Sequence, residues 1–331
     1  MPSSISLLYE PLIARDVAAI PAAVSRFRET ESSDTLFQAV ARFTFLAFAP
    51  TEHGRAAIAS ILAIFELKEL LDDHFDDWVT EAAIYTSQSR LPWSEPPISE
   101  PPAVTDPYDA TTAGIREAIQ SRDRHRAERW LAGRIQERDF GPDFFLQAAE
   151  SLADGGSGLT LAVNAWKLAA VFGERERYPI LRTVVWQWTS EGAEPAAPRG
   201  RTMRTPRLFE QLRARMVASG GEPESFRSLL LLDAAQQVTE LTKQSEVEES
   251  VTLTLERAEA PKPHESVKNS PGDEKPLEPY RLARDYGERI SAAALELRFG
   301  VRFPSLRGDS ISAAAAWNLE NGPSFEDWSF A

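Results

Sequence analysis

The sequence contains no cysteine among its 331 residues. Without a thiol, the chain cannot form a disulfide, a thiolate nucleophile or a metal centre with cysteine ligands. It also lacks an apolar run of about 18 residues, the length that a membrane-spanning helix needs. Residues 1–10 do not combine a basic region with an apolar core, as a secretory signal would. We therefore expect a cytoplasmic protein that has no membrane span.

Positive charge and histidine are both scarce. Lysine and arginine total 36 residues against 50 aspartates and glutamates, which gives a formal net charge of −14. Nucleic acids and anionic membranes are bound mainly through basic side chains, so this balance argues against both as partners. The four histidines do not form the His-Glu-x-x-His pattern of zinc proteases. With 43% hydrophobic and 26% charged residues, the composition is that of a globular protein with a hydrophobic core.

Helical signals dominate the chain, and we expect an all-α fold. Apolar residues recur at intervals of three and four, as on the buried face of a helix. Helices are predicted at residues 34–49, 54–71, 78–87, 111–137, 142–153, 159–172, 179–189, 207–219, 223–244, 290–299 and 311–319. Only residues 251–255, which alternate valine or leucine with threonine, have the pattern of a strand.

Breaks in the helical pattern suggest a domain organisation. The proline-rich residues 91–107 cannot form a regular helix and are expected to be an extended strap. We predict a helical domain at residues 1–190, a linker at residues 191–206 and a smaller, mainly helical C-terminal region at residues 207–331. Within that region, residues 258–279 are polar and contain proline, a composition that predicts a disordered loop.

An internal repeat relates two helical segments, at about residues 54–86 and 156–189. Residue classes match at an offset of 101 residues from Ile58 and of 103 residues near Thr86. A single helix pair cannot bury its apolar face, whereas two stacked pairs can. The sequence therefore predicts a helical repeat-like fold with two related helix-pair units.

Acidic side chains are concentrated in the string Leu-Leu-Asp-Asp-His-Phe-Asp-Asp-Trp, which begins at residue 70. Its Asp-Asp-x-x-Asp pattern at Asp72, Asp73 and Asp76 resembles the first metal motif of class I terpene synthases. The resemblance implies that these three carboxylates hold Mg²⁺, which would grip the diphosphate of a prenyl diphosphate substrate. The second metal motif of that family, an Asn/Asp-Asp followed by Ser/Thr and Glu, is not found in the sequence.

The same acidic string can instead be a turn between two helices, and we favour this interpretation. In the repeat alignment it falls opposite residues 172–179, where Gly173 suits the end of one helix and Pro179 the first turn of the next. Aspartate is a good N-cap, and carboxylates in a first helical turn interact favourably with the helix dipole. Ordinary capping would then explain the aspartates.

Three further residues are candidate ligand-binding residues. Trp166 belongs to an aromatic stripe that could line an apolar pocket or form part of the core. Asn164 is a polar residue on the same apolar segment and needs a hydrogen-bond partner if it is buried. His53 precedes a helix, where it could serve a ligand or only the helix start.

Two functions follow from these observations. The first is a non-catalytic role, either as a protein interaction module or as a binder of a hydrophobic small molecule between the helix pairs. The second is a Mg²⁺-dependent enzyme that acts on a prenyl diphosphate through Asp72, Asp73 and Asp76. Whether the chain is an enzyme stays open from the sequence alone.

Overall fold

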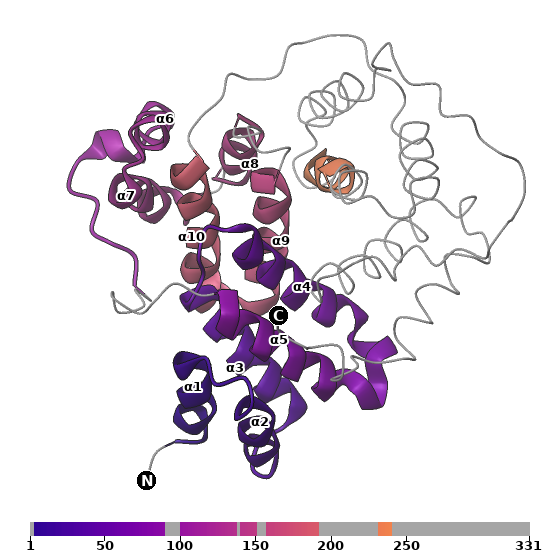
Figure 1. Cartoon of the computed structure of the whole chain (residues 1–331). Helices are drawn as coiled ribbons and strands as arrows, with labels where there is room; N and C mark the ends of the chain where they lie inside the picture. Colours follow the sequence, from indigo (N-terminus) through magenta and orange to yellow (C-terminus); the bar gives the residue numbers. More distant parts are fainter. Residues whose placement is uncertain (1–2, 90–99, 138–139, 151–156, 192–230, 240–331) are drawn as a thin grey trace, which may run out of the picture.

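The computed structural model describes residues 3–89, 100–137, 140–150, 157–191 and 231–239 of the chain (Figure 1). Every regular element within these ranges is a helix, which confirms the predicted all-α class. The helices are α1 (Ser4–Ala14), α2 (Ile20–Arg28), α3 (Ser33–Leu46), α4 (Glu52–Leu71), the short 3₁₀ helix η1 (Asp72–His74), α5 (Phe75–Ser89), the short 3₁₀ helix η2 (Pro107–Ala110), α6 (Thr112–Ser121), α7 (Arg124–Arg134), α8 (Phe140–Glu150), α9 (Ser157–Phe172) and α10 (Glu174–Glu191). Residues 231–239 form a further helix.

Several predictions fall outside the described residues. They are almost all of the linker, the strand at residues 251–255, the loop at residues 258–279 and the helices at residues 207–219, 290–299 and 311–319. Of the proline-rich segment, residues 101–106 are described and have no regular secondary structure, as expected from their prolines. The predicted division into domains stays a prediction.

The segment at residues 111–137, expected as a single helix, is two helices. Arg122 ends α6 with a left-handed backbone (φ 56°), and Asp123 begins α7 by accepting a hydrogen bond from the backbone N–H of Arg126 at 3.0 Å. An aspartate N-cap contributes about 1 kcal/mol to helix stability. The break is therefore stabilised by a local cap, although the apolar periodicity continues across it.

The start of α10 also differs from the expectation. The helix begins at Glu174 and not at Pro179, which lies in its second turn. Gly173 separates α9 from α10 and has φ +80°, the left-handed conformation that glycine adopts without strain. The glycine signal was therefore interpreted correctly, whereas the proline is accommodated within the helix, where it lacks one backbone hydrogen bond.

Two helical hairpins form the centre of the molecule. Helix α4 turns through η1 into α5, α9 turns at Gly173 into α10, and α4 packs directly on α9. Helix α3 packs against α5 and α10, α1 and α2 pack against α5, and α6 and α7 pack against α10 (Figure 1).

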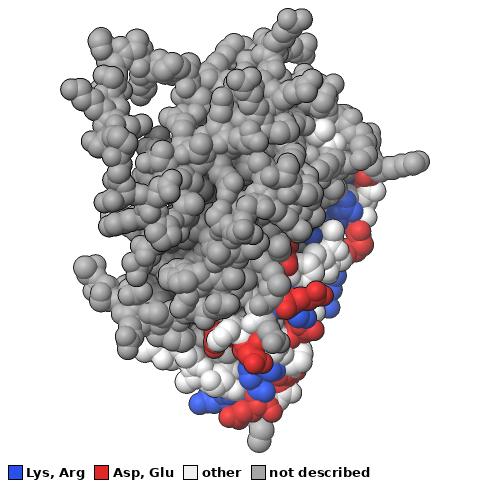
Figure 2. Space-filling view, turned by 90° about the vertical axis from the view of Figure 1, so that its right-hand side faces the viewer, with Lys and Arg blue, Asp and Glu red and all other residues white. Residues whose placement is uncertain are grey.

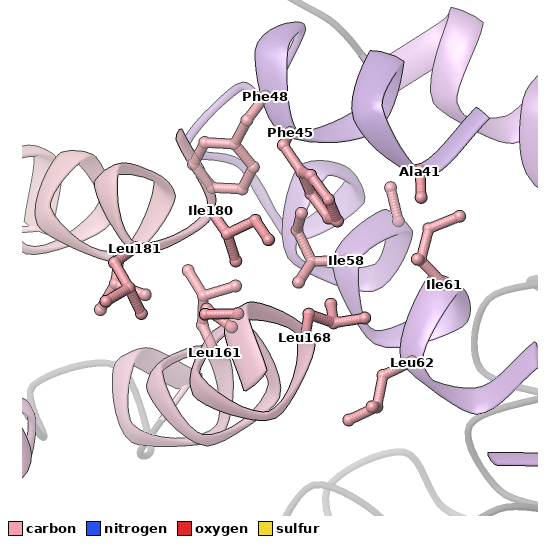
Figure 3. Packing of buried hydrophobic residues seen from close by; sticks show 14 of the residues in the cluster. Ala41, Phe45, Phe48, Ile58, Ile61, Leu62, Leu161, Leu168, Ile180 and Leu181 are labelled. Atoms are coloured by element: carbon pink, nitrogen blue, oxygen red, sulfur yellow. The ribbon is translucent and has the colours of Figure 1, made fainter. Parts of the chain in front are cut away.

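Apolar side chains fill the space where α3, α4, α9 and α10 meet. Phe45, Ile58, Leu161, Leu168 and Ile180 come together there, and each is almost fully buried (Figure 3). Each such side chain contributes about 1.5–3 kcal/mol through burial. The hairpins are therefore joined by a continuous hydrophobic core.

Charges of both signs lie beside one another on the described part of the surface seen in Figure 2. Ion pairs among the described residues include Lys167–Glu66 at 2.9 Å and Arg42–Glu176 at 3.6 Å. No helix in the described ranges is both long and apolar enough to cross a membrane.

Gly54 provides a test of the packing at the start of α4. A Cβ atom at this position would overlap the backbone carbonyl oxygen of Ala49 and lie 3.3 Å from a ring carbon of Phe48. We expect Gly54→Ala to lower the free energy of unfolding by about 1–3 kcal/mol, measured by urea denaturation, because the backbone has to shift. Ala59→Gly, on the same helix, measures the intrinsic preference for alanine, which is worth about 1 kcal/mol. A Gly54→Ala variant stabilised by that amount would contradict the predicted overlap.

Candidate functional site

The acidic string forms the turn between α4 and α5. Residues 72–74 make up η1, and Asp76 and Asp77 lie in the first turn of α5. In that position their carboxylates interact favourably with the N-terminal end of the helix dipole. The charged helix–helix turn is therefore present, as the favoured interpretation of the sequence predicted.

The side chains of this turn have separate partners. One carboxylate oxygen of Asp76 accepts a hydrogen bond from Arg28 Nε at 2.7 Å, and the other is buried and has no hydrogen-bond partner in the part of the chain that is described. His74 Nδ1 lies 3.4 Å from Asp77 Oδ2, and Asp73 is exposed. Among the described residues, no group of three or more histidines, aspartates or glutamates is arranged to hold a metal ion. The Mg²⁺ site at Asp72, Asp73 and Asp76 stays a prediction, and the ion pair with Arg28 does not favour it.

Trp166 lies in a cluster of aromatic rings. Its ring centroid is 5.2–5.9 Å from those of Phe140, Phe144 and Phe145 on α8. Arg177 lies over the same indole at 5.5 Å, and a Cβ atom on Gly141 would come within 3.2 Å of it. The indole is thus held by protein groups on several sides, as in a packed aromatic core.

The other two candidate ligand-binding residues lie in different surroundings. Asn164 is also on α9, is only 9% exposed, and stands two positions before Trp166, so the two side chains leave the helix in different directions. His53 is exposed at the start of α4, and its ring stacks on Tyr85 of α5 with centroids 4.7 Å apart. Among the described contacts, none links Trp166, Asn164 and His53 into one site.

Buried acidic side chains are the features that sequence reasoning did not identify. Four of them lie in the described part of the chain: Glu81, Asp109, Glu128 and Asp233. Burial of a carboxylate is costly unless hydrogen bonds or an opposite charge compensate it. The partners of each buried acid therefore distinguish a structural group from a candidate functional one.

Asp109 is held by two arginines on α7. Its oxygens accept hydrogen bonds from Arg126 Nε and Arg129 Nε, each at 2.6 Å. Burial raises the pKa of Asp109, but the hydrogen bonds and charges of Arg129 and Arg126 together outweigh that effect and lower the pKa below its usual range. This acid fastens η2 to α7, a structural role.

Glu128 and Asp233 also have partners. Oε1 of Glu128 accepts hydrogen bonds from Arg182 Nε at 3.0 Å and from Trp186 Nε1, and the Arg182 guanidinium lies 3.9 Å from the centroid of the Trp186 ring. Asp233 accepts a hydrogen bond from Gln237 Nε2 at 2.7 Å. The group formed by Glu128, Arg182 and Trp186 joins α7 to α10.

Glu81 is the exception. Its side chain is fully buried in α5, and neither carboxylate oxygen has a hydrogen-bond partner among the residues that the structure describes. Burial, together with the negative charge of Asp77, raises the pKa of Glu81 to about 7. A carboxyl group in this state accepts hydrogen bonds from a donor that reaches it, and it exchanges a proton near neutral pH.

Glu81 belongs to a stripe of residues along one side of α5. Asp77, Glu81 and Tyr85 are four residues apart, so they follow one another on the helix surface at intervals of about 6 Å. Asp77 has a half-exposed side chain, whereas Tyr85 is buried and stacks on exposed His53. The buried carboxyl group is therefore one helical turn from the surface.

A sequence signal for Glu81 exists in retrospect. It is the only charged residue between Asp77 and Arg90, in a segment that also contains Trp78 and Tyr85. Helix α5 is buried on every side from Trp78 through this segment to Ser87, so a charged residue there has no solvent-facing position. The usual amphipathic pattern assigns a charged residue to the solvent-facing side of a helix, so Glu81 does not stand out in the sequence.

Comparisons with known proteins give no further guide to the site. No family model matches the sequence, and no curated protein or solved structure is significantly similar to it.

Proposed function

We propose that this chain is a non-catalytic binding protein for a hydrophobic small molecule that carries a hydrogen-bond donor, with Glu81 as its polar anchor. The supporting observation is that both oxygens of Glu81 are buried and that no described part of the chain donates a hydrogen bond to them. An unpaired buried acceptor costs about 1–3 kcal/mol, and more if it is charged, so a ligand that donates to it gains that free energy. Ligand sites of this kind combine apolar walls with a few polar groups that fix the orientation.

The architecture that carries the site is, in this proposal, a pair of related helical hairpins. Each hairpin has a long first helix, a short break and a second helix of similar length, namely α4 to α5 and α9 to α10. Lys167 and Glu66, which are 101 residues apart, pair across the two first helices, and the repeat alignment has the same offset. A protein interaction module on this scaffold and a location in the cytoplasm stay predictions.

The test uses two probes of equal size that differ in one hydrogen-bond donor. We expect 1-octanol to bind the full chain about tenfold more tightly than heptyl methyl ether, which has no donor, in isothermal titration calorimetry. In Glu81→Leu this difference should vanish, whereas Glu69→Gln, a change at an exposed acid of α4, should retain it. If the preference for octanol persists in Glu81→Leu, Glu81 does not anchor the ligand, and if neither probe binds, Glu81 does not anchor a neutral one.

A further inference from the structure

We propose that the molecule bound at Glu81 is an organic cation, with an ammonium group that donates to both carboxylate oxygens and an apolar body. This inference rests on the proposed function and narrows its ligand class. Either a neutral donor or a cation can donate a hydrogen bond to one carboxylate oxygen of Glu81. Three observations favour the cation.

The first observation is how the protein pairs its other buried acids. Asp109 faces two guanidinium groups and Glu128 faces one, all through hydrogen bonds of 2.6–3.0 Å. Hydrogen bonds between charged groups are about twice as strong as neutral ones, and they offset the loss of hydration of a carboxylate. Glu81 is just as deeply buried but lacks such a partner. At two of the three other described buried acids the complement is a positive charge, whereas Asp233 accepts a hydrogen bond from the amide of Gln237. A cation at Glu81 follows the more frequent of these two arrangements.

The second observation is the charge around Glu81. Asp77, one turn earlier on α5, adds a second carboxylate to the same stripe. Arg28 belongs to α2, which packs against α5, and it is engaged by Asp76, while the imidazole of His74 lies beside Asp77. His53 of α4 stacks on Tyr85 at the other end of the stripe. A neutral donor gains nothing from Asp77, whereas a cation is attracted by both carboxylates.

The third observation is the number of donors that the site can accept. Both oxygens of Glu81 are buried and lack a hydrogen-bond partner within the described ranges. A hydroxyl group donates one hydrogen bond, whereas an ammonium group donates up to three and can satisfy both oxygens at once. An ammonium ligand would therefore leave no buried oxygen unpaired, and an alcohol would leave one.

The experiment compares octylammonium chloride with 1-octanol by isothermal titration calorimetry of the full chain at about pH 8. We expect octylammonium to bind wild type at least about tenfold more tightly than octanol. Glu81→Gln, which keeps the shape and removes the charge, should lose that preference. Glu69→Gln removes one exposed negative charge from neighbouring α4 and should leave the preference unchanged.

Proton release provides a second measurement. Glu81 is mostly protonated at about pH 6, because its pKa is raised to about 7. Binding of a cation there should release close to one proton per ligand, seen as a dependence of the binding heat on the ionisation enthalpy of the buffer. At about pH 9 the release from Glu81 should be near zero, and Glu81→Gln should not show it at either pH.

The outcomes separate the two proposals. If octanol and octylammonium bind wild type equally, and both are weakened in Glu81→Leu, the site exists and the cationic assignment is wrong. If the preference for octylammonium falls equally in Glu69→Gln, the attraction is only that of an acidic surface, and the assignment is again wrong. If neither compound binds, the proposed function fails together with the inference.

Discussion

The free energy of unfolding of Glu81→Gln will increase relative to that of wild type as the pH rises from about 4 to 9. Glu81 is fully buried, and its pKa is raised from 4.5 to about 7 by burial and by Asp77. Below pH 4.5 the group is protonated in both the folded and the unfolded chain, so its ionisation does not affect stability. Between pH 4.5 and 7 only the unfolded chain releases the proton, and wild type loses stability as the pH rises.

The size of this effect follows from the pKa difference. A rise from 4.5 to about 7 corresponds to a loss of about 3 kcal/mol above pH 7. The free energy of unfolding from urea titrations at several pH values, for wild type and Glu81→Gln, measures it. The difference between the two proteins should grow by about 3 kcal/mol between pH 4 and 9. Glu69→Gln should follow wild type throughout, and a difference independent of pH would contradict the burial of an unpaired carboxyl group at Glu81.

The helices were predictable where local signals and packing agree. Helices α3, α4 and α9 have strong apolar periodicity, and Gly173 has the positive φ expected of a glycine between two helices. The split at Asp123 was missed because its cap is a single side chain within a continuous periodic pattern. The start of α10 differs from the prediction because tertiary contacts upstream of Pro179 support the helix: Tyr178 is buried, and Arg177 lies over the Trp166 ring. Local rules fail where long-range contacts outweigh them.

The site was less predictable than the fold. The sequence draws attention to the dense acidic string, and this string is a helix–helix turn in which Asp76 pairs with Arg28, 48 residues away. Glu81 attracts no attention as a single acid in a helical segment. Its significance lies in what surrounds it and in its lack of a partner, both of which depend on residues distant in the sequence. Orphaned buried groups become visible only in three dimensions.

Removal of the carboxylate is expected to destabilise the protein at Glu128, a buried acid that accepts hydrogen bonds from Arg182 and Trp186. Glu128→Leu leaves Arg182 with a buried positive charge and removes the acceptor of Trp186 Nε1. Loss of one member of a buried ion pair costs about 3–5 kcal/mol, so we expect a decrease of that size in the free energy of unfolding.

A double variant separates the cost of removing Glu128 alone from the value of the Glu128–Arg182 pair. Glu128→Leu combined with Arg182→Met replaces both charges by apolar groups, and it should recover most of the stability lost in Glu128→Leu, because buried ion pairs contribute little over well-packed hydrophobic residues. The exposed pair Glu174–Arg177 is the control, and Glu174→Gln should cost less than about 1 kcal/mol. If the double variant is as unstable as the sum of the single variants, Glu128 and Arg182 act independently. The comparison of buried acids in this protein would then lose its basis, because it assumes that a carboxylate in this core needs a positive partner.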